Sequence, residues 1–270
     1  MSLSISGKTA IVTGSANGIG LAIARHLVDK GANVMFADID EARLEAEVGH
    51  DARAEGAVRF FAGDLTQKLT IANLLSATVD AFGRVDILVN ASRKMALSDP
   101  LSPEEDAVEV LLQQNLLTAL RLTQMTARRM IQAASKADLP DGSMIGSIIN
   151  ISSAASRLTR PELLAYSIST AAVEQMTRSM ALALAPRGIR VNAVAFGSVM
   201  SASLQSALKE NPVFREVIVA GTPLGRIAAP AELAETVQFL ASDAAGFITG
   251  QVITVDGGRS VIDAVAAPAH

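Results

Sequence analysis

Short apolar runs rich in β-branched residues alternate along the chain with longer segments whose apolar residues recur at helical spacing. Because the short runs are apolar at successive positions, both faces of each strand are expected to be buried beneath helices. This pattern predicts a doubly wound α/β fold with about seven parallel strands and helices on both faces of the sheet. The expected strands are Thr9–Thr13, Asn33–Ala37, Val58–Ala62, Asp86–Asn90, Ser147–Ile151, Arg190–Ala195 and Gln251–Val255.

The intervals between the strands carry the helical pattern, beginning with Leu21–Lys30 after the first strand. The longest interval, before the fifth strand, is expected to hold two helices, with a helix start at Ser102-Pro-Glu-Glu. Ser201–Ala220 predicts a helical excursion that either covers a ligand or lies on the surface. No linker divides the chain, so residues 1–270 are expected to form a single domain, with residues 259–270 as a C-terminal tail.

Composition narrows the classes of function. Half of the 270 residues are hydrophobic and the net charge is -4, which supports a large core and gives no electrostatic reason to bind nucleic acid. The chain has no cysteine, and His26, His50 and His270 lie far apart in the sequence, so no metal site is expected. Neither a signal sequence nor a long apolar stretch is present, so we expect a cytoplasmic protein without a membrane partner.

A glycine-rich turn joins the first strand to the first helix, with glycines at Gly14, Gly18 and Gly20. Such a turn lets the backbone approach a pyrophosphate closely, and the helix N-terminus stabilises its negative charge. The turn therefore predicts a dinucleotide site at this edge of the sheet. The cofactor contacts expected in the turn are Gly14, Ser15, Asn17, Gly18, Ile19 and Gly20.

Asp38 ends the second strand and points to the identity of the dinucleotide. A carboxylate at this position accepts hydrogen bonds from the adenosine ribose and repels a 2′-phosphate. No Arg or Lys lies in the turn or directly after Asp38 to neutralise an additional phosphate. NAD is therefore expected as the cofactor, in preference to NADP, with Asp38 and Ile39 at the adenosine ribose.

A set of motifs is spread along nearly the whole chain, from Lys8 to Gly258: Thr13–Gly20, Gly63-Asp64-Leu65, Asp86-Ile-Leu-Val-Asn90, Asn115, Asn150-Ile-Ser-Ser153, Tyr166 and Thr249–Gly258. With these motifs the chain resembles the short-chain dehydrogenase/reductase family, a group with a compact Rossmann fold that binds NAD(P). The resemblance implies a small carbonyl or alcohol substrate and a homotetramer or homodimer. The further cofactor contacts that it implies are Asp64, Leu65, Asn90, Ala91, Gly197 and Val199.

The resemblance also implies the catalytic residues. Tyr166, the single tyrosine, follows Ser153 by thirteen residues, as in the family. Ser153 is then expected to bind the substrate oxygen, Tyr166 to act as the acid/base, and Asn115 to hold a water that relays the proton. The family places a lysine four residues after the tyrosine, whereas this chain has Thr170. Thr170 can keep a hydrogen bond to the cofactor ribose, but it carries no charge.

The missing lysine matters because a tyrosine in water has a pKa near ~10, and a base working near neutral pH needs that value lowered by about 2–3 units. Phe196, where the family usually has proline, and the segment Asn90-Ala-Ser-Arg-Lys94 are further departures from the family pattern. We hypothesise that one nearby cation replaces the lysine; the alternative is that these charges are solvated. The candidates are Arg93, Lys94, Arg157 and Arg160.

Three functions remain open from the sequence. The first is an NAD(H)-dependent oxidoreductase that interconverts a secondary alcohol and a ketone, with Tyr166 as acid/base. The second is a dinucleotide-binding protein without efficient turnover, because residue 170 is threonine. The third is another transformation on the same scaffold, such as dehydration or epimerisation.

Overall fold

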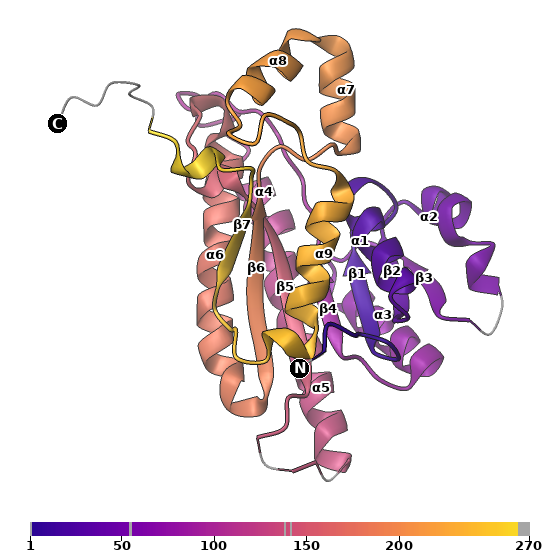
Figure 1. The fold of residues 1–270 in the computed structure, drawn as a ribbon. Helices are drawn as coiled ribbons and strands as arrows, with labels where there is room; N and C mark the ends of the chain where they lie inside the picture. The colour runs from indigo at the N-terminus through magenta and orange to yellow at the C-terminus, as the bar shows by residue number, and fades with distance from the viewer. Residues whose placement is uncertain (1, 54–55, 138, 141, 264–270) are drawn as a thin grey trace.

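A computed structural model describes residues 2–53, 56–137, 139–140 and 142–263 of the chain. Within these residues, seven strands form one parallel sheet in the order β3-β2-β1-β4-β5-β6-β7 (Figure 1). The predicted doubly wound α/β fold is therefore confirmed, and each strand lies where it was expected to within two residues. The strands are β1 (Thr9–Thr13), β2 (Asn33–Asp38), β3 (Val58–Ala62), β4 (Ile87–Asn90), β5 (Gly146–Ser153), β6 (Ile189–Phe196) and β7 (Val252–Val255).

Helices cover both faces of the sheet. Helices α1, α2 and α9 pack on one face, and α3, α5 and α6 pack on the other (Figure 1). Successive residues of a strand therefore serve different layers: Val12 of β1 joins the first core, and its neighbour Ile11 joins the second. The helices are α1 (Gly18–Asp29), α2 (Glu41–Val48), α3 (Lys68–Phe82), α4 (Val108–Leu111), α5 (Thr118–Lys136), α6 (Leu164–Leu184), α7 (Ala202–Glu210), α8 (Val213–Ala220) and α9 (Pro230–Ala241).

The helix start expected at Ser102-Pro-Glu-Glu is wrong. Residues 102–105 form a turn, in which the Glu105 N–H donates to the Ser102 carbonyl at 3.2 Å, and α4 begins only at Val108. Ala107 has a left-handed φ of 57°, which interrupts the chain before the helix. From Val108 the helix runs on through the π-helical segment η2 (Leu112–Leu117) into α5, so one long helical rod stands where two separate helices were expected.

The excursion predicted over residues 201–220 is present as α7 and α8, which break at Asn211 and Pro212. Both helices stand beyond the carboxyl ends of the strands (Figure 1). Part of the predicted tail is described: Arg259–Val261 form the short helix η7. Residues 264–270, which include His270, lie outside the described residues.

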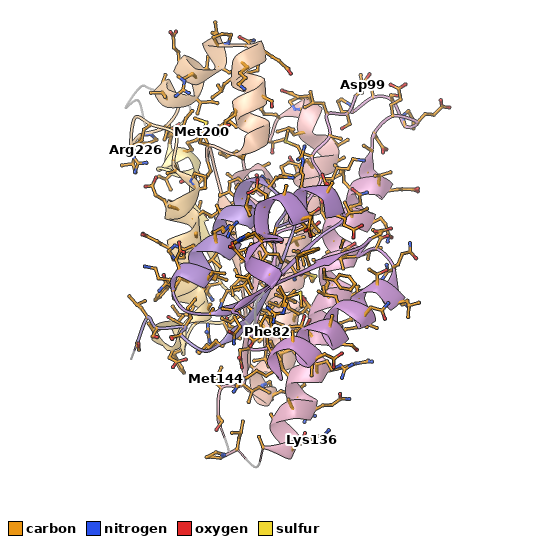
Figure 2. All side chains as sticks on the ribbon, turned by 90° about the vertical axis from the view of Figure 1, so that its right-hand side faces the viewer. Phe82, Asp99, Lys136, Met144, Met200 and Arg226 are labelled. Atoms are coloured by element: carbon orange, nitrogen blue, oxygen red, sulfur yellow. The ribbon has the colours of Figure 1, made fainter. Side chains whose placement is uncertain are left out.

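The two edges of the sheet face opposite ends of the molecule. Asp99 and Met200, which follow β4 and β6, lie at one end, while Phe82 and Met144, which precede β4 and β5, lie at the other (Figure 2). The chain leaves β1 toward β2 on one side and continues from β3 to β4 on the other side. The crevice outside the carboxyl ends of β1 and β4 is therefore the place where a ligand of such a sheet is expected.

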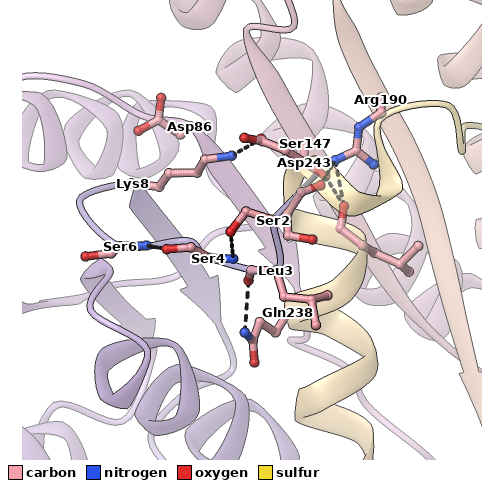
Figure 3. A network of polar contacts seen from close by, with 12 residues as sticks. Ser2, Leu3, Ser4, Ser6, Lys8, Asp86, Ser147, Arg190, Gln238 and Asp243 are labelled. Atoms are coloured by element: carbon pink, nitrogen blue, oxygen red, sulfur yellow. Dashed lines mark hydrogen bonds and ion pairs between the residues drawn. The ribbon is translucent and has the colours of Figure 1, made fainter.

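At the opposite, amino edge, the N-terminal segment is tied to the end of α9 (Figure 3). Lys8 pairs with Asp243 at 2.6 Å, and Gln238 donates to the Leu3 carbonyl at 3.0 Å. Arg190 donates to the Leu240 carbonyl at 2.7 Å, and burial lowers the pKa of its guanidinium. These contacts hold α9 against the sheet at the end away from the crevice.

Candidate active site

The glycine turn between β1 and α1 lies against the loop that follows β4. Gly14 and Gly18 have left-handed φ values of 67° and 56°. A Cβ on Gly14 would lie 2.7 Å from the Ser92 Cα, and a Cβ on Gly20 would lie 2.0 Å from the Gly14 carbonyl oxygen. The turn is thus so closely packed against backbone that Gly14 and Gly20 have no room for a side chain.

The start of α1 opens onto the crevice without a protein cap. Asn17 occupies the N-cap position but makes no side-chain capping bond, and the first turn has no acidic residue. The first N–H groups of a helix have no acceptor within the helix, and the helix dipole makes this end positive. The arrangement is complementary to an anion such as a pyrophosphate.

Asp38 is held rigidly at the end of β2. Its carboxylate accepts hydrogen bonds from the backbone N–H groups of Ala16 at 3.0 Å, Ile39 at 2.7 Å and Asp40 at 3.2 Å. The first of these bonds connects Asp38 to the glycine turn. The negative charge therefore keeps a fixed position beside the turn, where it meets whatever group binds there.

Asp64 follows β3 at the same edge. The Thr66 backbone N–H and hydroxyl both donate to its carboxylate, at 2.9 and 2.8 Å, and these bonds hold the pKa of Asp64 below its usual value. The Asp64 carboxylate is consequently ionised at neutral pH, and Thr66 of the same loop holds it in position. Leu65, the next residue, is buried and lines the crevice.

These groups enclose a cavity of about 480 Å³, which we call the cofactor cavity. The predicted cofactor contacts that line it are Gly14, Asn17, Gly18, Ile19, Gly20, Asp38, Ile39, Asp64, Leu65 and Ala91. Lining residues that the sequence did not single out as cofactor contacts are Gly63, Thr66, Ser92, Arg93, Lys94, Met95, Gln114, Thr118 and Ser201. Most of these sit on loops after the strands, where the sequence carries no periodic signal.

Some predicted contacts lie outside the cofactor cavity. Ser15 is buried, and its hydroxyl donates to the Ala37 carbonyl at 3.4 Å. Asn90 is buried and donates to the Asn150 side chain at 2.8 Å, which joins β4 to β5. Both residues support the site from within the sheet.

A second cavity of about 480 Å³ opens beside Tyr166 and Ser153, and we call it the substrate cavity. Tyr166 lies near the start of α6 with 2% of its surface exposed, and Ser153 ends β5. The Ser153 hydroxyl accepts a hydrogen bond from the Ala155 N–H at 3.2 Å. The other lining residues include Leu158, Leu163, Phe196, Gly197, Val199, Leu204 and Ala207, so the cavity is largely apolar, with Arg160 and Arg259 at its walls.

Arg93 lies between the two cavities and lines both of them. Its guanidinium donates a hydrogen bond to the Tyr166 hydroxyl. The Cζ atom of the same group lies 4.3 Å from the centre of the Phe196 ring, at a distance where a cation is attracted to an aromatic face. Arg93 therefore connects the loop after β4 to the ends of β6 and α6.

The loop that carries Arg93 is fixed on both sides of this residue. Before it, the Ala91 and Ser92 N–H groups both donate to the Thr13 hydroxyl at 3.1 Å. After it, Asn115 accepts from the Lys94 N–H at 2.8 Å and donates to the Lys94 carbonyl at 2.9 Å. Asn115 sits in the π-helical segment, a local widening of the helix that is frequent at functional sites.

Thr170 lies beneath Tyr166 on α6 and reaches neither large cavity. Its hydroxyl donates to the carbonyls of Tyr166 and Ser167, at 2.9 and 3.1 Å, and only 4% of the residue is exposed. A small cavity of about 10 Å³ separates Thr170 from Asn115 and Arg93. The hydroxyl is thus engaged by its own helix.

Of the other cations near the site, two are paired with carboxylates. Arg160 pairs with Glu162 at 2.6 Å, and Arg157 lies 3.6 Å from Glu174. Lys94 lines the cofactor cavity but not the substrate cavity. Arg93 is the candidate whose guanidinium contacts Tyr166.

Within the described residues, no group of three His, Asp or Glu side chains is arranged to hold a metal ion. No helix of that part of the chain is long and apolar enough to cross a membrane.

Comparison with known proteins places this site in context. A family profile described as enoyl-(acyl carrier protein) reductase matches residues 14–260. The chain is similar to a 3-oxoacyl-(acyl-carrier-protein) reductase of Thermotoga maritima, with 33% identity over 94% of this chain and 98% of the relative. It is also similar to a cis-4-hydroxycyclohexanecarboxylate dehydrogenase of Sinomonas cyclohexanicum, with 34% identity over 94% of this chain and 97% of the relative.

A solved structure agrees with these relatives. A 7α-hydroxysteroid dehydrogenase in complex with NADH and 7-oxo glycochenodeoxycholic acid superposes with a TM-score of 0.85 and 29% identity. The match covers 95% of each chain. Fold, length and sequence therefore agree over nearly the whole chain.

Proposed function

Because this chain belongs to the short-chain dehydrogenase/reductase family of oxidoreductases, we propose that it interconverts a secondary alcohol and a ketone with NAD(H), using Tyr166 as the acid/base. The observation that carries the proposal is the meeting of the two cavities. Arg93, Met95 and Ser201 line both of them. The Tyr166 hydroxyl lines the substrate cavity and is contacted by Arg93, one of these shared residues. A hydride and a proton can be exchanged with one substrate only where these two spaces join.

The residues of the cofactor cavity fit a dinucleotide. The absence of side chains on Gly14 and Gly20 lets the turn pack against the loop after β4 and against itself. The uncapped start of α1 offers N–H groups to a pyrophosphate. When bound, the nicotinamide would accept or donate the hydride. The fixed carboxylate of Asp38 favours NAD, since a 2′-phosphate would face a like charge there.

The chain's own side chains supply the proton chemistry. In the reductive direction, the ketone oxygen accepts a hydrogen bond from the Ser153 hydroxyl and then the proton of Tyr166, while the carbonyl carbon receives the hydride. In the oxidative direction, the Tyr166 phenolate takes the proton of the alcohol. The largely apolar walls of the substrate cavity offer a surface for the apolar part of a substrate.

Three assays test the proposal. NADH binding is followed by the fluorescence of the cofactor itself, with Asp38→Ser expected to weaken NADH binding and strengthen NADPH binding. Turnover is followed at the nicotinamide absorbance with a 3-oxoacyl thioester, a 4-hydroxycyclohexanecarboxylate and a 7-oxo bile acid, the compounds named for the similar proteins. Tyr166→Phe is expected to abolish turnover and to leave NADH binding within about threefold of the unsubstituted protein.

A second candidate is a dinucleotide-binding protein without efficient turnover. The hydroxyl of Thr170, which points back to its own helix, favours it, because the position of the family's lysine then contributes nothing to the site. Tight NADH binding with no absorbance change on a broad panel of ketones and alcohols would support this candidate and contradict the first.

A cytoplasmic location is also part of the proposal, and the family resemblance adds a homotetramer or homodimer. Light scattering on the purified protein tests the assembly, and a monomer at micromolar concentration would contradict it.

A further inference from the structure

The contact between Arg93 and Tyr166 has no counterpart among the residues that the family resemblance implies. We propose that Arg93 is the cation that stabilises the Tyr166 phenolate, in place of the lysine that the family has where this chain has Thr170. This inference rests on the proposed function only where turnover is concerned. The electrostatic coupling of the two side chains can be tested without substrate or cofactor.

The Arg93 guanidinium is directed at the phenol of Tyr166. Its N–H donates to the Tyr166 hydroxyl oxygen, the atom that carries the negative charge after proton transfer. Arginine stays protonated at any pH relevant here and has donors only, so it can stabilise the phenolate but cannot take its proton. The proton therefore travels between Tyr166 and the substrate oxygen, and the guanidinium keeps all of its own hydrogens.

Within the described residues, no carboxylate neutralises the charge of Arg93. Its guanidinium contacts Tyr166 and the Phe196 ring and forms no ion pair with a carboxylate in that part of the chain. The Phe196 face holds the cation in place without cancelling its charge. An unpaired cation beside a phenol stabilises the ionised form of that phenol.

The other charged groups that line the substrate cavity have partners of their own. Arg160 pairs with Glu162 at 2.6 Å, and Arg259 donates to the Ser198 hydroxyl at 2.7 Å. On the helix of Tyr166, two turns further on, the buried Glu174 is held by two serine hydroxyls and two arginines: Ser152, Ser156, Arg157 and Arg178.

The space next to Thr170 is small and adjoins Arg93. The cavity of about 10 Å³ beside it has Arg93 and Asn115 in its wall and has room for about one water molecule. A lysine at position 170 would have to extend into this space, next to the guanidinium. Two like charges would then compete for one phenol, so Arg93 and the family's lysine are alternative solutions.

The experiment uses the fact that Tyr166 is the only tyrosine and that the chain has no tryptophan. The rise in absorbance at ~295 nm with pH therefore reports the ionisation of this single phenol in the cofactor-free protein. Arg93→Met removes the charge and keeps a long side chain, Arg93→Lys keeps the charge, and Arg160→Met removes a different cation from the same cavity. Circular dichroism at each pH establishes that the fold is intact, and Arg93→Gln is the second neutral variant if Arg93→Met does not fold.

If Arg93 stabilises the phenolate, the midpoint of this titration is expected to lie at least about 1 pH unit higher in Arg93→Met than in the unsubstituted protein. Arg93→Lys is expected to recover most of the difference, and Arg160→Met is expected to titrate like the unsubstituted protein. An equal midpoint in Arg93→Met and Arg160→Met would overturn the proposal.

Exchange of the two solutions gives a second test. Thr170→Lys in the unsubstituted protein is expected to give no gain in turnover, because a lysine there would have to enter a space of about 10 Å³ that already has Arg93 in its wall. In the Arg93→Met background, Thr170→Lys is expected to return the titration midpoint to that of the unsubstituted protein. It is also expected to raise turnover at least tenfold above that of Arg93→Met alone. A large gain from Thr170→Lys with Arg93 present, or faster turnover in Arg93→Met, would contradict the assignment, the latter by identifying Arg93 as a barrier between the cavities.

The two proposals fail separately. A shifted midpoint in Arg93→Met with no turnover by any form would support the coupling and refute the proposed reaction. Turnover with an unshifted midpoint would support the reaction and refute the role of Arg93.

Discussion

Asn115 is expected to act by holding the loop that carries Arg93, and Asn115→Ala tests this role. The substitution removes the bond accepted from the Lys94 N–H and the two bonds donated to the Lys94 carbonyl and the Ser169 hydroxyl, at 2.8, 2.9 and 3.0 Å. Each hydrogen bond of this kind contributes about 0.5–1.5 kcal/mol. We therefore expect the free energy of unfolding to fall by about 2–4 kcal/mol, and the Tm by roughly 5–15 °C.

The stability is measured by urea and thermal unfolding, and the position of Arg93 by the absorbance titration of Tyr166. Once the loop is free, the guanidinium leaves the phenol, so Asn115→Ala is expected to titrate at higher pH than the unsubstituted protein. Gln113→Ala is the matched control, since Gln113 is an amide in the same π-helical segment whose side chain makes no hydrogen bond within the described residues. It is expected to change neither the stability nor the titration by a measurable amount.

A different outcome would support the role that the family resemblance implies, in which Asn115 holds a water for proton relay. In that case Asn115→Ala would lower kcat while its unfolding free energy and its titration matched those of Gln113→Ala. That combination would refute the anchoring role.

Three further changes probe the turn, the amino edge and the surface. Gly20→Ala places a Cβ 2.0 Å from a backbone oxygen of the turn and is expected to weaken NADH binding at least tenfold. Gly83→Ala is the control, because a Cβ on Gly83 faces open space at a φ of 78°. It is expected to lower the free energy of unfolding by only about 1 kcal/mol and to leave NADH binding unchanged. Arg190→Met removes three hydrogen bonds to backbone carbonyls and is expected to lower the urea unfolding free energy by about 1–3 kcal/mol. Equal stability would show that the donors these carbonyls keep, from Ser147, Asn192 and Ala245, are sufficient. The Arg226 guanidinium, which hydrogen-bonds Glu232, lowers the pKa of that carboxyl from 4.5 to about 2, so its stabilising effect is complete above pH 4.5 and is lost as the pH falls toward 2. Glu232→Gln is expected to flatten the dependence of Tm on pH across that window, and an unchanged slope would contradict this.

The fold could be predicted because its signals are local and repeated. Each of the five inner strands is a short apolar run that helices bury on both faces, and the glycine turn follows the first of them along the chain. The edge strands β3 and β7 are mostly half-buried but carry the same apolar signal. Errors arose where local signals competed. Ser102-Pro-Glu-Glu has the composition of a helix start, but a turn there and the left-handed Ala107 delay the helix to Val108.

Predicted cofactor contacts that come directly from a strand end, such as Asp38 and Asp64, line the cofactor cavity. The sequence did not single out loop residues of the same cavity such as Met95 and Ser201, because their place in it depends on how distant segments pack. Thr170 was expected at the cofactor because of its position in the sequence motif. The structure places it against the carbonyls of its own helix, an alternative that a threonine always has and a lysine does not.

The sequence could not choose among the four cations near Tyr166, because all four lie within loops or turns and have equal charge. Arg157 and Arg160 have a carboxylate within reach. Lys94 lines the cofactor cavity but not the substrate cavity, whereas Arg93 contacts Tyr166 and forms no ion pair within the described residues. The choice depends equally on Phe196, which ends β6 and offers its ring to the guanidinium at 4.3 Å. A proline at that position would have no ring face for a cation. The departure of Phe196 from the family pattern and the absence of the lysine are therefore parts of one change, in which an arginine on the neighbouring loop supplies the charge. Phe196→Pro should then lower turnover more in the protein with Arg93 than in the Arg93→Met/Thr170→Lys protein. Equal effects on turnover would show that Phe196 and the absence of the lysine are independent departures from the family pattern.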